Sequence, residues 1–469
     1  MSSAIVVGSG PNGLACAAVL AKRGVEVTVI EAEDRIGGGT RSSELTVPGL
    51  LHDECAATHP MAVSAPATLE LELERYGLEW AWPEVDLAHP LDGGRGATML
   101  RSLEATAAGL GKAGARWRQI FGPPSRGYAT LSEDIYRPFA HVPRHPLRLL
   151  RFGLPAAAPA TALARALGTP EAAALFGGVA AHAFAPLNRP LSSSIGMALI
   201  SAGHADGWPV AKGGSIAIAD AFAAVIGGHD GRIETGRRVG SLAELPAADA
   251  VILDLSPRGV LELAGDRLPA RSARAYRRYK HGPAAFKLDL AVEGGVPWAY
   301  EPARRAATVH VCGSFEEIAL AEREVNRGRM PERPYVLLAQ QYLADPQRSR
   351  GDLHPVWAYA HVPSGYSGDA TAAILDQIER FAPGLRDRIV ATSTRTPAEI
   401  EAANANFVAG DILTGANTPL QTLLRPRITA SPYRTGIPRV FICSAATPPG
   451  AGAHGINGYN AARAVLRTL

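Results

Sequence analysis

The fold is decided by residues 4–31, AIVVGSGPNGLACAAVLAKRGVEVTVIE. Its first four residues form a short apolar, partly β-branched run, which is typical of a strand buried on both faces of a parallel sheet. This run ends at glycines 8, 10 and 13, which fit the pattern G-x-G-x-x-G. The sequence then predicts a helix from about residue 12 to residue 23 and a second strand over residues 25–30. This order predicts a βαβ unit that binds a dinucleotide.

Each glycine of the turn has a physical role in such a unit. Gly8 permits the tight turn, Gly10 lets the backbone approach a pyrophosphate, and Gly13 lets the helix pack closely on the strand. The unpaired N–H groups and the positive dipole end of the helix would stabilise a diphosphate placed there. We therefore predict that the cofactor is bound by the whole turn: Gly8, Ser9, Gly10, Pro11, Asn12 and Gly13.

An acidic residue and a second glycine cluster follow. Glu31 lies close to the spacing of about 20 residues at which an acid meets a ribose hydroxyl, and its carboxylate would repel the 2′-phosphate of NADP. Residues 32–42, AEDRIGGGTRS, come where an NAD-binding protein would normally continue its sheet. Glycines there would let a larger cofactor pass close beneath the backbone.

At this point the sequence resembles the FAD-dependent superfamily of amine oxidases and phytoene desaturases, whose second signature is R-x-G-G-R-x-x-S/T. Arg35, Gly37, Gly38 and Ser42 match this signature, whereas a glycine stands where the second arginine is usual. Whether Arg41 replaces that arginine is left open. The resemblance implies that FAD is the cofactor and that this stretch contacts it through Ala32, Arg35, Gly38, Gly39 and Thr40.

The C-terminal stretch has the same order of elements as the N-terminal one: a strand, a glycine-rich loop and a helix. An apolar strand over 439–443 leads into a glycine-rich loop over 444–458 and then a helix that extends through 466. The positive end of this helix would face the flavin pyrimidine edge and favour hydride acceptance. The arrangement resembles the C-terminal flavin motif of phytoene-desaturase-like proteins, although Ser444 and Ala445 stand where an acid is frequent. The resemblance implies cofactor contacts from Ser444, His454, Gly455 and Ile456, and from the backbone of Val239, which would hold the adenine.

The expected fold class is α/β, with a Rossmann-like FAD-binding domain and an interleaved α+β substrate domain made of a mixed sheet and a helical cap. We assign residues 1–90, 207–275 and 426–469 to the discontinuous FAD-binding domain. Residues 91–206 and 276–425 would form the substrate-binding or cap domain. Strands are expected near 285–292, 335–339 and 356–362, and helices over 161–167, 170–184, 216–226 and 371–381. The residues of this domain that could line a substrate cavity are Lys287, Trp298, His310, Trp357, Tyr359 and His361.

No catalytic residue is identified by its motif, but three candidates stand in loops. His454 precedes the last helix and could touch substrate or flavin, or it could cap that helix. Lys212 lies near a shared pattern of the family, and an exposed loop lysine is the alternative. His59, or His52 nearby, could face the substrate, and each could instead be solvated or hydrogen-bonded locally.

Composition excludes several classes of function. The net charge is +3 and charged residues make up 19% of the chain, with no basic stripe interleaved with aromatics, so nucleic-acid binding is not expected. The four cysteines show no CxxC spacing, so neither a metal site nor a redox dithiol is expected. The absence of a long apolar run and of room for a signal peptide before the first strand favours a cytoplasmic protein. Residues 144–152, RHPLRLLRF, combine basic and apolar character, which fits either peripheral membrane contact or a cap helix with solvated arginines.

The resemblance implies an FAD-dependent oxidoreductase of the dehydrogenase or desaturase type, which removes hydride from a C–H bond of a lipophilic small molecule. Outside residues 8–13, no G-x-G-x-x-G stands between a predicted strand and helix, so a separate NAD(P)H domain is not indicated. An amine oxidase is the nearest alternative. The other alternative is a flavin-binding protein with a non-redox or partner-binding role.

Overall fold

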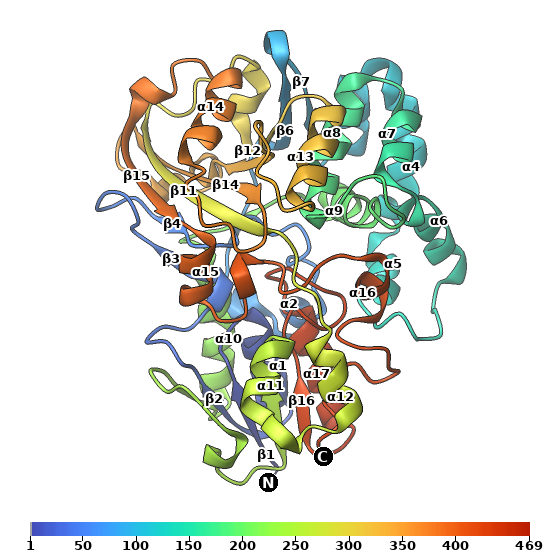
Figure 1. Cartoon of the computed structure of the whole chain (residues 1–469), viewed down its shortest axis with the longest axis vertical. Helices are drawn as coiled ribbons and strands as arrows, with labels where there is room; N and C mark the ends of the chain where they lie inside the picture. Colours follow the sequence, from blue (N-terminus) through green and yellow to red (C-terminus); the bar gives the residue numbers. More distant parts are fainter. Residues whose placement is uncertain (1) are drawn as a thin grey trace.

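The computed structural model describes residues 2–469, and two β-sheets organise it. A parallel sheet occupies the lower half of the molecule in Figure 1, near both chain termini, and a larger mixed sheet occupies the upper half. The expected α/β class with a Rossmann-like unit is confirmed by this arrangement. The chain passes between the two halves several times, so each is assembled from segments that are distant in sequence.

The lower sheet has five parallel strands in the order β16-β10-β1-β2-β9. Its strands come from the start, middle and end of the chain: β1 (Ser3–Val7), β2 (Glu26–Ile30), β9 (Arg232–Glu234), β10 (Ala250–Leu253) and β16 (Val440–Ile442). One face packs on α1 (Pro11–Lys22), α10 (Ile216–Gly228) and α17 (Ile456–Leu466). The other packs on α11 (Pro257–Ala264) and α12 (Ala270–Arg277). Because both faces are covered, the central strands are apolar along their length, as the first four residues of the opening stretch predicted.

The upper sheet has seven strands in the order β15-β11-β14-β13-β12-β6-β7, and only the β12–β6 pair within it is parallel. The strands are β6 (Val85–Leu91), β7 (Arg95–Met99), β11 (Ala284–Glu293), β12 (Ala306–Val311), β13 (Val336–Ala339), β14 (Leu353–Val362) and β15 (Ile389–Arg395). The boundary placed after residue 90 therefore runs through the end of β6, which pairs with β12 and not with the lower sheet. The division of the chain into the two proposed domains otherwise stays a prediction.

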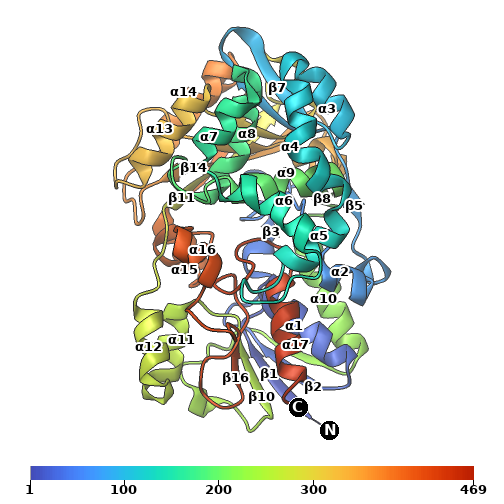
Figure 2. The same ribbon diagram turned by 90° about the vertical axis from the view of Figure 1, so that its right-hand side faces the viewer.

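Helices cover both faces of the upper sheet, as Figures 1 and 2 show. The helical cap on one face comprises α3 (Leu103–Gly109), α4 (Gly114–Arg126), α5 (Tyr128–Ile135), α6 (Pro146–Ala157), α7 (Ala160–Leu167), α8 (Pro170–Ala180) and α9 (Ser194–Asp206), with α13 (Phe315–Val325) beside α8. On the opposite face lies α14 (Thr371–Phe381), with the bounds expected from its apolar stripe. The prediction of a helix over 170–184 overshoots, because α8 ends at Ala180 and a short 3₁₀ turn follows.

Short elements join the two halves. They are β3 (Ser42–Ser43) paired with β4 (His52–Asp53), β5 (Trp80–Ala81) paired with β8 (Val210–Ala211), and the helices α2 (Pro66–Leu71), α15 (Pro397–Ala403) and α16 (Pro419–Leu424). Ser215 directly precedes α10, but its hydroxyl does not cap the helix and instead donates to the carbonyl of Ala56. Across residues 2–469, we find no helix with both the length and the apolar character needed to cross a membrane.

Candidate functional site

The N-terminal ends of α1 and α17 meet at contact distance. A Cβ atom on Gly458 would lie 1.8 Å from the carbonyl oxygen of Asn12, and one on Gly455 would lie 2.8 Å from the Cβ atom of Ala15. Only glycine lets the two backbones approach so closely. Both views show the helices side by side beneath the upper half of the molecule (Figures 1 and 2). The two positive helix ends are therefore brought to one place, as the repeated strand, glycine loop and helix at the chain ends predicted.

The glycine turn after β1 is packed against a carboxyl group from β10. The N–H of Gly13 donates to Oδ2 of Asp254 at 3.0 Å, and a Cβ atom on Gly10 would lie 2.6 Å from the same oxygen. Burial raises the pKa of Asp254 to about 7, and the nearby Glu31 carboxylate acts in the same direction. At neutral pH this acid is therefore partly protonated, which lessens its repulsion of an anion at the turn.

Glu31 ties the turn to the end of β2. Its Oε2 accepts hydrogen bonds from the N–H of Ser9 at 2.8 Å and from the Ser9 hydroxyl at 2.5 Å, while Oε1 accepts from the N–H of Glu33 at 2.9 Å. Arg41 lies 3.8 Å from this carboxylate and donates to the carbonyl of Arg35. A carboxylate held this way is fixed in position and able to accept further hydrogen bonds.

A cavity of about 110 Å³ opens over the glycine turn. Its wall includes Gly8, Ser9, Gly10, Glu31 and Asp254, together with Arg237 to Val239. Val239, which was predicted to hold the adenine, therefore lines this cavity. The glycine cradle, the helix N-terminus and the acid at the end of β2 together fit the adenosine diphosphate half of a dinucleotide. The residues that would hold it are Gly8, Ser9, Gly10, Glu31, Ala32, Gly38, Arg41 and Val239.

The other predicted cofactor residues are placed differently. Arg35 points outward to Glu54, with more than half of its side chain exposed, and the Thr40 hydroxyl is buried against the carbonyl of Gly37. Gly39 faces Phe407: a Cβ atom there would lie 3.1 Å from its ring. Pro11, Asn12 and Gly13 form the start of α1 behind the cavity wall. Ser444 donates to the carbonyl of Leu255, so its hydroxyl is already engaged.

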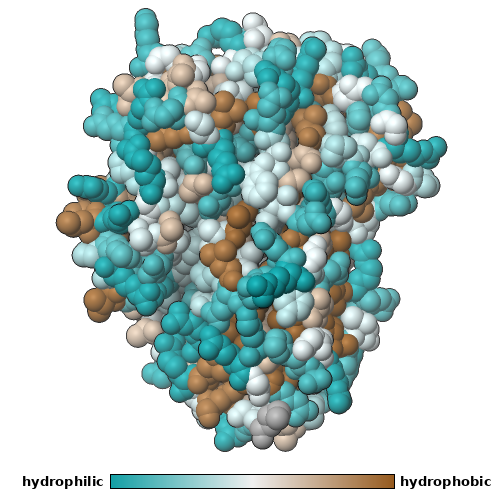
Figure 3. Space-filling view, turned by 180° about the vertical axis from the view of Figure 1, so that it is seen from behind, coloured by the Kyte–Doolittle hydropathy of each residue, from teal (hydrophilic) through white to brown (hydrophobic). Residues whose placement is uncertain are grey.

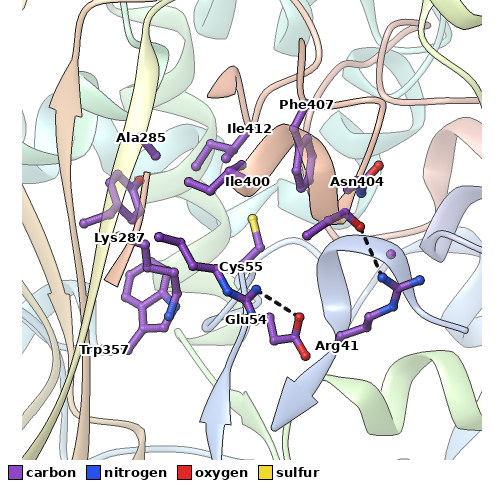
Figure 4. Close-up of a pocket in the computed structure, with 14 residues that line it drawn as sticks. Arg41, Glu54, Cys55, Ala285, Lys287, Trp357, Ile400, Asn404, Phe407 and Ile412 are labelled. Atoms are coloured by element: carbon purple, nitrogen blue, oxygen red, sulfur yellow. Dashed lines mark hydrogen bonds and ion pairs between the residues drawn. The ribbon is translucent and has the colours of Figure 1, made fainter. Parts of the chain in front are cut away.

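A small inner pocket adjoins the dinucleotide cavity and has charged side chains in its wall (Figure 4). The two share Gly38, Arg41 and the segment Ala403–Asn404 in their walls. Lys287 projects into the pocket from β11 beside Trp357, and its ammonium group forms a buried ion pair with Asp289. Burial lowers the pKa of Lys287, opposed by the Asp289 carboxylate. Lys287, Trp357 and Tyr359 line this pocket, whereas Trp298, His310 and His361 are packed into the protein interior.

The largest cavity near the two helix ends has a volume of about 340 Å³ and an apolar wall. It lies between the helical cap and the C-terminal glycine loop, with Phe152, Leu199, Trp208, Leu413 and Gly450–His454 among its lining residues. No Asp, Glu, Lys or Arg side chain stands among the described residues that line it. The cavity therefore offers a neutral ligand an environment without fixed charge.

Three histidines stand among the residues that line this cavity: His59, His182 and His454. Burial lowers the pKa of His59 and His454 to about 4 and that of His182 to about 3, so all three are neutral at pH 7. His182 pairs through Nε2 with Nε2 of His310 at 3.0 Å. The Nε2 atom of His59 lies 2.9 Å from the hydroxyl oxygen of Ser215. Because Ser215 donates its only hydroxyl proton to the carbonyl of Ala56, Nε2 of His59 carries a proton and donates it to the Ser215 oxygen.

The structure gives His454 the capping role, one of the two that the sequence left open. Its Nδ1 accepts the N–H of Ile456 at 3.2 Å, which caps α17 and places the ring proton on Nε2. This Nε2 is buried and has no hydrogen-bond partner within residues 2–469. A buried donor without a partner is costly, so the position fits an acceptor atom of a bound group. The third candidate, Lys212, is half exposed and pairs with exposed Glu79 outside these cavities.

Several residues of the site were not found from the sequence. Asp254 directly follows the strand β10, and the rule that ligands bind at the carboxyl ends of parallel strands could have indicated it. His182 and the segment Ala403–Asn406 carry no local signal, because they reach the site only through packing of the upper half.

Comparison with known proteins agrees with this geometry. Residues 6–69 match the model of the NAD(P)-binding Rossmann-like domain. The pyridine nucleotide-disulfide oxidoreductase domain-containing protein 2 of Mus musculus is 33% identical over 97 residues, which is 20% of this chain and 16% of that protein. The same protein of Rattus norvegicus is 23% identical over 300 residues, which is 56% of this chain. The match spans 52% of the rat protein, so the chain corresponds to about half of its length.

Solved structures extend the likeness to the whole chain. An oxidoreductase from Methanosarcina mazei superposes with a TM-score of 0.66 at 15% identity, covering 99% of this chain and 100% of that one. The cyclohexylamine oxidase from Brevibacterium oxydans IH-35A gives a TM-score of 0.58 at 15% identity and covers 99% of both chains. The fold implied by the motif resemblance is thereby confirmed. Residues 6–69 therefore match a Rossmann-like domain, and over its whole length the chain shares its fold with the oxidoreductase from Methanosarcina mazei and with the cyclohexylamine oxidase.

Proposed function

We propose that this protein is an FAD-dependent oxidoreductase that removes hydride from a C–H bond of a neutral, lipophilic small molecule. The observation that carries the proposal is the meeting of two helix N-termini between a cavity that fits adenosine diphosphate and an uncharged cavity of about 340 Å³. Bound FAD would supply the redox chemistry by accepting hydride. The protein would contribute binding, orientation and the exclusion of water.

The lining of the apolar cavity supports a neutral substrate. A protonated amine entering this cavity would lose its hydration without gaining a carboxylate, and an unpaired buried charge costs several kcal/mol or more. The neutral histidines His59, His182 and His454 add no fixed charge to this wall, and the Nε2–H group of His454 can donate to a hydroxyl or carbonyl oxygen. These properties support a dehydrogenase or desaturase that acts on a lipophilic molecule.

An amine oxidase is the second candidate, because a cyclohexylamine oxidase shares the fold of the whole chain. Such an enzyme could bind its amine in the neutral form and would release hydrogen peroxide with amines. The uncharged cavity weighs against cationic amines in particular.

The test begins with the purified protein. An absorbance scan and mass spectrometry of the released ligand should identify FAD, and anaerobic addition of neutral lipophilic compounds should bleach the flavin bands. Peroxide release with amines, but no bleaching by neutral compounds, would favour the amine oxidase. Product without bleaching would indicate a non-redox reaction. Correctly folded protein that is colourless and cannot be reconstituted with FAD would refute the proposal.

A further inference from the structure

Large apolar side chains that are exposed gather in two short segments. Of the twelve such side chains within residues 2–469, seven lie in the segments 139–154 and 420–428. We call these two segments the apolar rim. Its exposed members are Phe139, Val142, Leu147, Leu150, Leu154, Leu420 and Ile428.

The helix α6 has two apolar faces with different surroundings. Leu147, Leu150 and Leu154 recur at helical spacing and form one outward stripe, with 73%, 56% and 67% of their surfaces exposed. On the opposite face, Phe152 is buried and lines the apolar cavity. Figure 3 shows the molecule from behind, so α6, which lies on the right in Figure 1, is at the left edge there. Apolar side chains project among hydrophilic ones at this edge. A single helix thus separates the cavity from the exposed stripe.

The helix α16 repeats this arrangement on the other side of the cavity. Leu420 is 61% exposed, while Thr422 in the same helix lines the cavity. Figure 2 shows α6 and α16 on the same face of the molecule, at its waist. The cavity therefore lies between two elements that both present apolar side chains to solvent.

The charge of the rim has one sign. Residues 135–170 and residues 412–469 contain no aspartate or glutamate, whereas Arg144, Arg148 and Arg151 stand on or just before α6. Within residues 2–469, the one ion pair involving these three joins Arg144 to Glu133 of α5. An apolar stripe beside arginines is complementary to a lipid surface that carries negative charge.

We infer that the apolar rim docks on the surface of an anionic lipid bilayer and turns the mouth of the apolar cavity toward the lipid. Leucines of α6 and α16 would enter the boundary between headgroups and acyl chains, while the arginines contact anionic headgroups. The delivery of a lipophilic substrate from the bilayer rests on the proposed function, but the docking itself does not. Among occupants of this surface, a bilayer suits both properties of the rim, because apolar and cationic side chains alternate along one helix.

Vesicle sedimentation tests the inference with the full-length protein. We expect binding to vesicles of phosphatidylcholine mixed with phosphatidylglycerol, and weaker binding to phosphatidylcholine alone or at high salt. The double variant L147E/L150E should lower the partition coefficient about tenfold or more, because it replaces burial of two leucines with two repelled charges. The variant L320E is the matched control, since Leu320 is an exposed leucine on α13, away from the rim, and should bind as the wild type does.

A second pair of variants separates the electrostatic contribution. R148Q and R151Q should each weaken binding to the anionic vesicles about fivefold and leave binding to neutral vesicles unchanged. Failure of the wild-type protein to sediment with anionic vesicles would overturn the inference, as would equal binding by L147E/L150E. The inference would also be overturned if light scattering showed that the wild-type protein is a dimer and that L147E/L150E is a monomer, because the rim would then be an interface between two copies. Flavin absorbance of the same samples reports separately on the proposed function, so the two can fail independently.

Discussion

Substitution of Gly458 by alanine tests whether α1 and α17 must cross in contact. The added Cβ atom would lie 1.8 Å from the carbonyl oxygen of Asn12 and 2.9 Å from the backbone nitrogen of Cys16. Both neighbours are backbone atoms of α1, so no side chain can rotate away. The helices would have to separate by roughly 1.5 Å to restore an ordinary van der Waals contact.

The expected cost combines two opposing effects. Overpacking of this kind destabilises by about 1–3 kcal/mol, and the rigid neighbours place G458A near the upper end. Alanine regains at most about 1 kcal/mol through its higher helix propensity. We therefore expect the free energy of unfolding to fall by about 2 kcal/mol, together with weaker flavin binding, because one of the two positive helix ends moves away from the cofactor.

The assay is urea unfolding combined with the flavin content of the purified protein. The matched control is G227A, since Gly227 lies in α10, is exposed, and would place an added Cβ atom in open space with no neighbour within 4 Å. This control should be neutral or slightly stabilised, with full flavin content. If G458A matched G227A in both measurements, the close crossing would not hold the two ends of the chain together and the reasoning would be refuted.

Three further predictions concern the turn and the inner pocket. D254N should be more stable than the wild type at pH 9 and similar to it at pH 4. The reason is that burial raises the pKa of Asp254 to about 7, so ionisation of this acid destabilises the folded wild type as pH rises from about 4 through 7. The free energy of unfolding of the wild type should fall by at most about 4 kcal/mol over this range. G10A places a Cβ atom 2.6 Å from Oδ2 of Asp254 and should reduce FAD affinity at least tenfold in equilibrium titration, because an open cradle is needed at the diphosphate. K287M should lower the free energy of unfolding by about 3–5 kcal/mol through the unpaired Asp289, and K287M/D289L should regain much of that loss in urea denaturation.

Each of these predictions has an outcome that contradicts it. A constant difference between D254N and the wild type from pH 4 to pH 9 would mean that Asp254 does not titrate in this range. Unchanged affinity of G10A for FAD would place the diphosphate elsewhere. Additive effects of the two substitutions in K287M/D289L would show that Lys287 and Asp289 do not stabilise each other.

The parts of the fold that could be predicted from sequence are those fixed by local pattern. The opening βαβ unit was placed to within one or two residues, because apolar strands, a glycine turn and a helix follow one another within residues 4–31. The same holds for α14, whose apolar stripe marks both ends. In contrast, β6 pairs with β12, more than 200 residues later in the chain, and no local signal records such a partner. The strand β15, along which exposure alternates, was also not predicted, because its sequence IVATSTR contains few of the large apolar residues that mark a strand.

The candidate site divides in the same way. Gly8, Ser9, Gly10 and Glu31 line the dinucleotide cavity as the βαβ pattern indicated, and Val239 lines it as the resemblance implied. For the upper sheet, however, a strand pattern predicts on which face of the sheet a side chain lies. It does not predict whether a cavity or a packed helix covers that face. His310 and His361 were expected to line the substrate cavity, yet His361 is fully buried against Glu322 and His310 lies one residue behind the wall, paired with His182. Both faces of the sheet are covered, so alternation cannot separate the two cases.

The distribution of charge connects the two cavities to a division of tasks. Arg41, Glu54, Lys287 and Arg395 border the inner pocket, where Arg395 and Lys287 are paired with acids. The apolar cavity has no such group in its described wall, and its histidines are neutral at pH 7. Electrostatic interactions are strong in a water-poor interior, so charges kept in the inner pocket can act on a cofactor without attracting ionic ligands into the substrate space. Under the proposed function, a neutral molecule would lose little hydration on binding in this cavity, so the absence of charge in its wall would favour neutral ligands over ionic ones.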